Sequence, residues 1–228
     1  MRDKIAPSLA LIAGIWLVRN LYVMLLGLGD EADQGAIYRI MYFHIPSWWT
    51  CFAAYMAAGI ASILYLVKKD SKYDTFAVAS VEVGLAFTCV GLATGSIWAR
   101  IIWGIWWTWD ARLTWALITC LVYAGYLMLR NAIDDPSTRA KNAAALCIFA
   151  FVSVAITWKS IEWWRTQHPG PVISFRTGGG KMDPAFESMV FQNWAALAFL
   201  AVALILIRMR QETMQREVDS LRRQIHAA

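Results

Sequence analysis

Charged residues are scarce in this chain. Asp, Glu, Lys and Arg make up 16% of its 228 residues, 59% of the residues are hydrophobic, and the mean hydropathy is +0.46. A soluble domain is nearer a quarter charged and half apolar. The composition therefore excludes an ordinary soluble domain and predicts an integral membrane protein.

The sequence lacks the residue patterns that several kinds of functional site require. The four cysteines form neither a CxxC nor a CxxCH pattern, which excludes a disulfide framework and a covalent haem attachment motif. The stretch FRTGGGKMDP at 175–184 lacks the spacing of a phosphate-binding loop and the Ser or Thr after its Lys, so we interpret it as a flexible loop. The predicted outer loops contain no Ser/His/Asp or Cys/His set for hydrolytic catalysis. We therefore predict that the chain is not an enzyme.

Six apolar stretches are present, each close to the roughly 20 residues that a bilayer-spanning helix needs. They occupy about 7–28, 47–67, 75–97, 112–129, 142–158 and 189–207. The predicted fold is thus an all-α integral membrane protein, a six-transmembrane-helix bundle. A Trp-rich interfacial segment is expected between the third and fourth helices, on the outer face of the membrane.

The distribution of Lys and Arg predicts the orientation of this bundle. These residues are more frequent in the terminal segments and in the short connections after the second and fourth stretches than in the loops 29–46, 98–111 and 159–188. Because cytoplasmic segments carry the excess of positive charge, both termini are predicted to be cytoplasmic and those three loops to be outside. The net charge of +5 then reflects topology and contact with anionic lipid, and it favours no nucleic acid partner.

Two regions of the chain are predicted to differ in character. Residues 1–208 form the six-span membrane domain, whose Trp-rich outer loop covers about 98–112. Residues 209–228 form a basic, amphipathic cytoplasmic tail that continues the last span as a helix. Four apolar residues recur on one face of this tail: Met214, Val218, Leu221 and Ile225.

Tryptophan is concentrated on one side of the predicted bundle. The stretch WGIWWTWD contains five residues of interest: Trp103, Trp106, Trp107, Trp109 and Asp110. Every Trp except Trp16 is predicted in or beside an outer loop, whereas a membrane-interface belt places Trp at both faces. If the stretch were helical, Trp103 and Asp110 would share a face and Trp109 would point away. Packing against lipid or core, and a platform for a flat ligand, are both compatible with this pattern.

Two histidines accompany these tryptophans. His44 in MYFHIPSWW lies just before the second span, and His168 in WWRTQHPGP lies just after the fifth. Both are predicted in outer loops, next to Trp pairs and beside proline. Haem is the ring best suited to two imidazole ligands and several indoles. A zinc site needs a third or fourth ligand nearby, and the sequence shows none.

Three segments together resemble one protein family. WGIWWTWDARLTW, YRIMYFHIP before the second span and IEWWRTQHPGP after the fifth are similar to segments of the cytochrome c maturation protein C family, also called haem exporter protein C. The resemblance extends over nearly the whole chain, and six spans with cytoplasmic termini fit that family. It implies a haem-handling protein of the bacterial inner membrane whose site faces the periplasm.

The resemblance also implies roles for individual residues and partners. His44 and His168 would be the axial ligands to the iron of haem b. Trp103, Trp106, Trp107, Trp109 and Asp110 would form the haem-facing motif. The implied partners are a membrane-anchored periplasmic haem chaperone that takes up haem covalently, a small single-span accessory subunit, and an ABC-type ATPase with its membrane subunit.

Two arginines flank the Trp motif, and one acid lies inside a span. Arg100 and Arg112 are suited to hold haem propionates through charge-assisted hydrogen bonds, although one of them could instead pair with Asp110. Glu82, near the inner end of the third span, is costly to bury as an ion, and the sequence identifies no partner for it.

Two other functions remain open on the residues alone. A membrane cytochrome b-like electron carrier would normally place paired histidines within its spans, and no predicted span contains one. A structural subunit of a transporter, without a ligand, would use Trp only as membrane anchors and would leave the two outer histidines unexplained.

Overall fold

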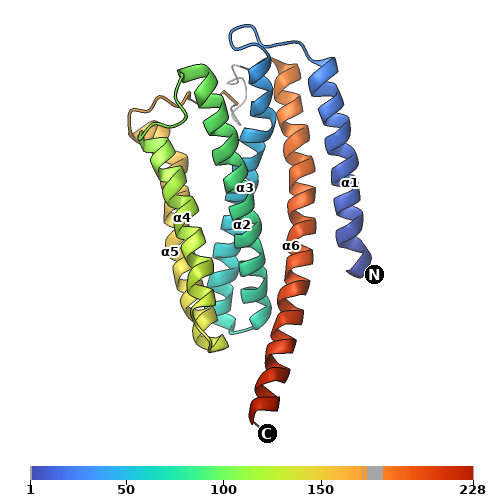
Figure 1. The fold of residues 1–228 in the computed structure, drawn as a ribbon, viewed down its shortest axis with the longest axis vertical. Coiled ribbons are helices and arrows are strands. Elements are labelled where there is room, and N and C mark those ends of the chain that lie inside the picture. Colours follow the sequence, from blue (N-terminus) through green and yellow to red (C-terminus); the bar gives the residue numbers. More distant parts are fainter. Residues whose placement is uncertain (1, 171, 174–181, 228) are drawn as a thin grey trace.

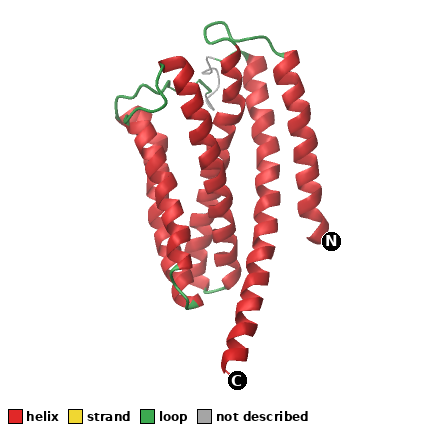
Figure 2. Cartoon of the chain, in the orientation of Figure 1, coloured by secondary structure: helices red, strands yellow, loops and turns green. Residues whose placement is uncertain are grey.

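The computed structural model describes residues 2–170, 172–173 and 182–227, and this part of the chain is almost wholly helical (Figure 2). The elements in chain order are α1 (Arg2–Tyr22), the π turn η1 (Val23–Gly27), the 3-10 turn η2 (Ala36–Ile40), α2 (Met41–Lys68), α3 (Ser71–Trp103), α4 (Ala111–Asn131), α5 (Pro136–Trp163) and α6 (Pro184–Ala227). Six helices are long and apolar enough to cross a membrane, which confirms the predicted all-α, six-span bundle (Figure 1). Most of the predicted flexible loop 175–184 lies outside the described residues.

Aspartates start three of these helices. The side chains of Asp70, Asp110 and Asp135 accept hydrogen bonds from backbone N–H groups in the first turns of α3, α4 and α5. An N-cap of this kind satisfies a donor that has no partner within the helix. Gly104 ends α3 in the left-handed region, with a φ of 76°. The Trp stretch therefore leaves the helix after its first tryptophan, and its helical alternative is wrong.

The core is built around close packing of α2 against α3. At Gly84 of α3 an added Cβ would lie 2.8 Å from the ring of Tyr55, and at Gly91 it would lie 2.8 Å from the ring of Trp48. Small residues allow helices in a membrane to approach closely, and here they make room for large rings of the partner helix. Farther along the core, the rings of Tyr55 and Tyr123 stack with their centroids 3.6 Å apart.

The helix α1 packs against α6 at the edge of the bundle (Figure 1). Its polar pair Arg19 and Asn20, unusual within a span, is satisfied by α6. Buried Asn20 donates to Asn193 at 2.8 Å, and Arg19 donates to Gln192. These contacts explain how the first apolar stretch accommodates two polar residues.

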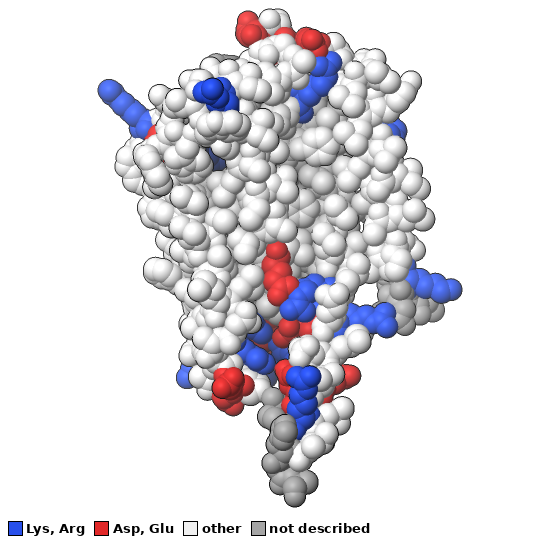
Figure 3. All heavy atoms as spheres, viewed as in Figure 1, with Lys and Arg blue, Asp and Glu red and all other residues white. Residues whose placement is uncertain are grey.

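Most of the buried charge lies at one end of the bundle, where α3 begins and α4 ends, and we call this end the charged end. Arg130 of α4 forms two hydrogen bonds with Asp74 of α3, at 2.6 and 3.1 Å, and both side chains are buried. Arg216 of α6 also pairs with Asp74, and Arg208 pairs with Glu82. This network joins α3, α4 and α6, and it supplies the partner of Glu82 that the sequence did not identify. Charged side chains gather there below a broad uncharged belt (Figure 3).

The helix α6 continues beyond the other helices at the charged end (Figure 1). The helix is unbroken at residues 208–209, where the sequence analysis places the boundary between membrane domain and tail. The four apolar residues expected on one face of the tail are all exposed: Met214, Val218, Leu221 and Ile225.

Candidate functional site

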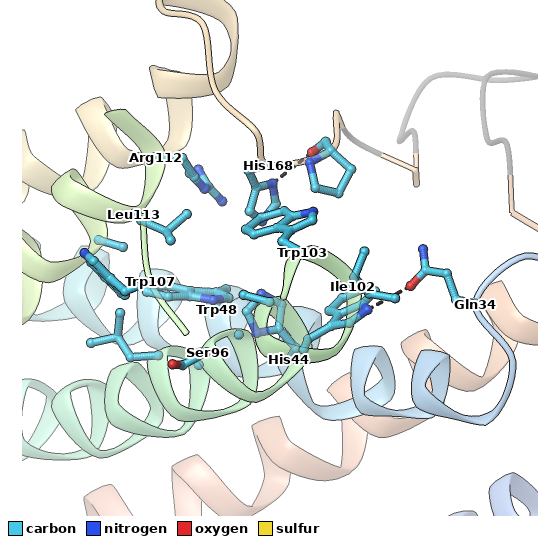
Figure 4. Close-up of a pocket in the computed structure, with 17 residues that line it drawn as sticks. Gln34, His44, Trp48, Ser96, Ile102, Trp103, Trp107, Arg112, Leu113 and His168 are labelled. Atoms are coloured by element: carbon cyan, nitrogen blue, oxygen red, sulfur yellow. Dashed lines mark hydrogen bonds between the residues drawn. The ribbon is translucent and has the colours of Figure 1, made fainter. Parts of the chain in front are cut away.

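A mostly apolar cleft lies at the opposite end of the bundle, which we call the tryptophan end (Figure 4). It is formed by α2, α3, the start of α4, the Trp segment and the loop that follows α5. Its lining includes His44, Trp48, Gly95, Trp98, Trp103, Trp107, Arg112 and His168. The structure thus brings together the two predicted histidines, which are 124 positions apart in the sequence.

His44 is held against α3 in a fixed orientation. It belongs to the first turns of α2 and is buried, so its prediction as a loop residue is wrong; α2 begins earlier than predicted, at Met41. Its Nδ1 lies 3.0 Å from the hydroxyl oxygen of Thr94, and that hydroxyl donates to the carbonyl of Val90 at 2.7 Å. Since the hydroxyl proton is used in this way, Nδ1 of His44 carries a proton and donates it. The unprotonated nitrogen is therefore Nε2.

The close approach of His44 to α3 depends on Gly95. A Cβ at this position would lie 2.8 Å from Cε1 of the imidazole. The ring is also edge-on to two indoles, with centroid distances of 6.3 Å to Trp48 and 5.9 Å to Trp98. Trp98 in turn donates from Nε1 to Gln34 at 2.8 Å. These contacts leave the imidazole little rotational freedom.

His168 also lines the cleft, and the same one of its ring nitrogens is unprotonated. Its Nδ1 lies 2.8 Å from the carbonyl oxygen of Pro169. A carbonyl can only accept, so Nδ1 donates and Nε2 is unprotonated. Burial, together with the nearby positive charge of Arg112, lowers the pKa of His168 to about 4. The imidazole is consequently neutral at pH 7, which is the state that binds a metal.

The cleft provides two imidazole donors and lacks a complete site for a bare metal ion. Among the described residues, no group of three or more His, Cys, Asp or Glu is positioned to hold a metal. Iron in a porphyrin already has its in-plane ligands and takes axial ligands from the protein. Two neutral imidazoles in an aromatic cleft are suited to that chemistry.

The tryptophans of the WGIWWTWD stretch divide into two pairs. Trp103 and Trp107 line the cleft, and Nε1 of Trp107 is buried without a hydrogen-bond partner in the described structure. Trp106 and Trp109 are absent from the lining and are exposed, at 58% and 76%. An uninterrupted helix would also place Trp103 and Trp107 on one face, together with Asp110. The turn at Gly104 changes this arrangement at Asp110, which lies outside the lining.

The two flanking arginines also differ in position. Arg112 lines the cleft and donates to the carbonyl of Thr157 at the last turns of α5. Arg100 lies outside the lining, donates to the carbonyl of Gly104, and has its guanidinium carbon 6.0 Å from the centroid of the Trp106 ring. Within the described residues neither arginine forms an ion pair with Asp110, which was the alternative left open by the sequence.

Asp110 is likewise outside the lining of the cleft. Burial raises the pKa of its carboxyl group, but hydrogen bonds from Leu113, Thr166 and Gln167 outweigh that effect and lower it overall. The carboxylate is therefore ionised at neutral pH and is fully engaged with the protein.

Sequence reasoning missed the residues that hold His44 in place. Thr94, Gly95 and Trp98 belong to α3, and Trp48 lies one helical turn after His44 on α2. The one available signal was this four-residue spacing between His44 and Trp48, which places both on one helix face once residue 44 is assigned to a helix.

Comparison with known proteins gives a consistent result. A model of the heme exporter protein C family matches residues 1–224. The heme exporter protein C of Bradyrhizobium diazoefficiens is 38% identical over 218 residues, which cover 96% of this chain and 82% of that protein. For the Escherichia coli protein of the same name, the identity is 33% over 81% of this chain and 73% of the relative. The Haemophilus influenzae protein of the same name is 32% identical over 94% of this chain and 87% of that protein. The chain belongs to the heme exporter protein C family.

Proposed function

We propose that this chain binds haem b in the cleft at the tryptophan end and presents it to a membrane-anchored haem chaperone during the maturation of c-type cytochromes. The observation that carries this proposal is the pair His44 and His168, which line one indole-lined cleft and hold their Nδ1 atoms in hydrogen bonds, so that Nε2 of each is unprotonated. In this role both histidines are axial ligands to the haem iron. Haem is the cargo, and the chain acts as a platform rather than as an enzyme.

The remaining lining residues fit a porphyrin. Trp103 and Trp107 provide flat apolar surface against the ring, and each indole can bury about 150–250 Å². Arg112 brings a positive charge into the cleft, where a guanidinium binds a carboxylate such as a haem propionate well. Trp106, Trp109 and Arg100 are better placed to contact lipid or a partner at the surface.

The orientation in the membrane follows from charge. The charged end, with its Lys and Arg, is assigned to the cytoplasm and the tryptophan end to the periplasm. The uncharged belt between them corresponds to the apolar interior of the bacterial inner membrane (Figure 3). The cleft then opens where a periplasmic chaperone can reach bound haem.

The partners are proposed on the basis of family membership. The relatives are named as exporter proteins, which is consistent with an ABC-type ATPase, its membrane subunit and a small single-span subunit as further components. Since no residue of this chain is assigned to ATP hydrolysis, the energy for releasing the loaded chaperone is attributed to the ATPase.

The test is covalent haem on a coexpressed chaperone in a strain that lacks its own copy of this protein. We expect His44→Ala and His168→Ala to reduce the loading strongly, because each removes one iron ligand. His226→Ala is the matched control, since it removes the third histidine of the chain, in the predicted tail. Immunoblots of the membranes establish that the variants are present at equal levels. Normal loading by the double variant His44→Ala, His168→Ala would contradict the proposal.

Spectra of the purified protein separate this function from its rivals. A haem-presenting platform contains up to one bis-imidazole haem per chain and passes it on. An electron carrier retains its haem and leaves the chaperone unloaded. A structural subunit purifies without haem.

A further inference from the structure

The carboxylate of Asp110 forms hydrogen bonds in two directions. Its Oδ1 accepts from the backbone N–H of Leu113 at 2.9 Å and thereby caps α4. Its Oδ2 accepts from the hydroxyl of Thr166 at 2.6 Å and from the backbone N–H of Gln167 at 3.0 Å. One side chain thus joins the end of the Trp segment to the loop that follows α5.

The second of these connections leads directly to His168. The hydroxyl oxygen of Thr166, which donates to Asp110, accepts from the backbone N–H of His168 at 3.0 Å. The chain of hydrogen bonds therefore runs from the carboxylate through Thr166 to the backbone of the histidine. Hydrogen bonds to an ionised group are about twice as strong as neutral ones, so this connection is well suited to fix a backbone position.

The described part of this loop is held at two places, by hydrogen bonds close to α5 and by the buried side chain of Ile173 farther along. The helix α5 ends at Trp163, and the next residue is already extended, with φ −131° and ψ 161°. In the described structure, the hydrogen bonds that tie residues 165–170 to another part of the chain end on Asp110. By contrast, His44 lies on a long helix and is fixed by α3. Within the described residues, the hydrogen bonds that link the backbone near His168 to the rest of the bundle thus pass through this one carboxylate.

We propose that Asp110 is a positioning residue, which holds the loop so that the imidazole of His168 reaches the iron, and that it does not itself contact haem. The inference rests on the proposed function in one respect, the role of His168 as an axial ligand. It assigns the acid of the WGIWWTWD stretch a task different from that of the indoles. Without it, iron bound in the cleft keeps the ligand from α2 and loses the ligand from the loop.

Three variants separate this role from simple helix capping. Asp110→Ser keeps a side chain that can cap α4, because serine is a good N-cap residue, but its single hydroxyl is too short to hold the loop as well. Thr166→Val removes the hydroxyl that links Asp110 to the backbone of His168, retains the bond from the N–H of Gln167 and leaves α4 untouched. Asp135→Ser is the control, since Asp135 caps α5 in the same way at the charged end.

The first measurement uses the full-length protein without haem, in detergent. Trypsin cleavage after Arg165, within the loop, reports how often the loop opens. We expect Asp110→Ser and Thr166→Val to accelerate this cleavage about fivefold or more, as the loss of one or two hydrogen bonds predicts. Asp135→Ser should cleave there at the wild-type rate.

The second measurement uses the same proteins loaded with haem. The absorbance spectrum of Asp110→Ser should change from a six-coordinate, bis-imidazole form to a five-coordinate form, and added free imidazole should restore the six-coordinate spectrum. Wild-type cleavage and an unaltered spectrum in Asp110→Ser would overturn the inference. A changed spectrum with wild-type cleavage would also overturn it, because it would indicate direct contact with haem. Wild-type behaviour of Thr166→Val in both measurements would contradict the connection through Thr166.

Failure of the proposed function has a separate signature. If His168→Ala retains the wild-type spectrum, His168 is not a ligand and the proposed haem site is wrong. The faster cleavage of Asp110→Ser would still be observed in that case, because it is measured without haem.

Discussion

The two ends of the helix bundle use polar residues in opposite ways. At the charged end, Asp74 and Arg130 are buried and satisfy each other, and Arg216 adds a further pair. At the tryptophan end, His44 and His168 are held through Nδ1 while Nε2 of each is left without a proton. The first arrangement closes a set of interactions within the protein. The second leaves one ring nitrogen of each histidine without a proton in a cleft, so we associate stability with the charged end and propose ligand binding at the tryptophan end.

Among the variants that test the different roles of the two ends, the largest effect, a loss of stability, is expected at the charged end. Arg130→Leu leaves Asp74 buried without its main partner, and breaking a buried ion pair in this way costs about 3–5 kcal/mol. The thermal unfolding midpoint in detergent should fall strongly. Lys72→Gln, which breaks an exposed pair with Asp70, is the control and should leave the midpoint unchanged. Haem bound to the folded fraction of Arg130→Leu should keep its wild-type spectrum; a change of axial ligation would break the comparison.

The next effect concerns the two pairs of tryptophans. Trp103→Ala with Trp107→Ala removes the indoles that line the cleft, and each buried aromatic anchor contributes about 2 kcal/mol or more to binding. Two such anchors amount to about 4 kcal/mol, so haem affinity, measured by titration, should fall by a factor of several hundred. Trp106→Ala with Trp109→Ala removes the same number of indoles from the exposed surface and should leave the affinity nearly unchanged. Equal losses in both double variants would refute the division of the motif.

Arg112, in the cleft, and Arg100, outside it, allow a similar comparison, with a smaller expected loss of haem affinity. Arg112→Gln removes a cation from the cleft, and a lost hydrogen bond to a charged group costs about 1.5–3 kcal/mol. We expect haem to bind at least about tenfold more weakly, whereas Arg100→Gln should bind it normally. If both variants retain wild-type affinity, neither arginine holds a propionate.

The smallest effect is expected from the residue behind His44. Thr94→Val removes the acceptor for Nδ1 and keeps the volume of the side chain. The loss of a typical hydrogen bond is about 1 kcal/mol, so haem affinity should fall about fivefold while the stability of the protein changes little. Unchanged affinity and an unchanged spectrum would mean that packing against Gly95 and the neighbouring indoles orients this imidazole on its own.

The sequence predicted the number of helices and the convergence of the two histidines better than it predicted their surroundings. Apolar length and charge bias are properties of single segments, so the six spans were accessible. The separation of Asp110 from the face of Trp103 was not accessible, because it depends on the left-handed backbone at Gly104, which a sequence pattern does not specify. Glu82 was recognised as costly to bury, but its partner Arg208 lies 126 positions later in the chain, on α6. No local sequence pattern indicates a pairing over that distance. Thr94 and Gly95 were missed for the same reason, since their roles appear only when α2 and α3 are placed in register.

The central claim is that His44 and His168 bind one iron, and the most direct test is the electron paramagnetic resonance spectrum of the oxidised, haem-loaded protein. The wild type and His226→Ala should give a low-spin, bis-imidazole signal with one haem per chain. His44→Ala and His168→Ala should each give a high-spin, five-coordinate signal or lose haem altogether. An unaltered low-spin, bis-imidazole signal from the double variant His44→Ala, His168→Ala would contradict the account.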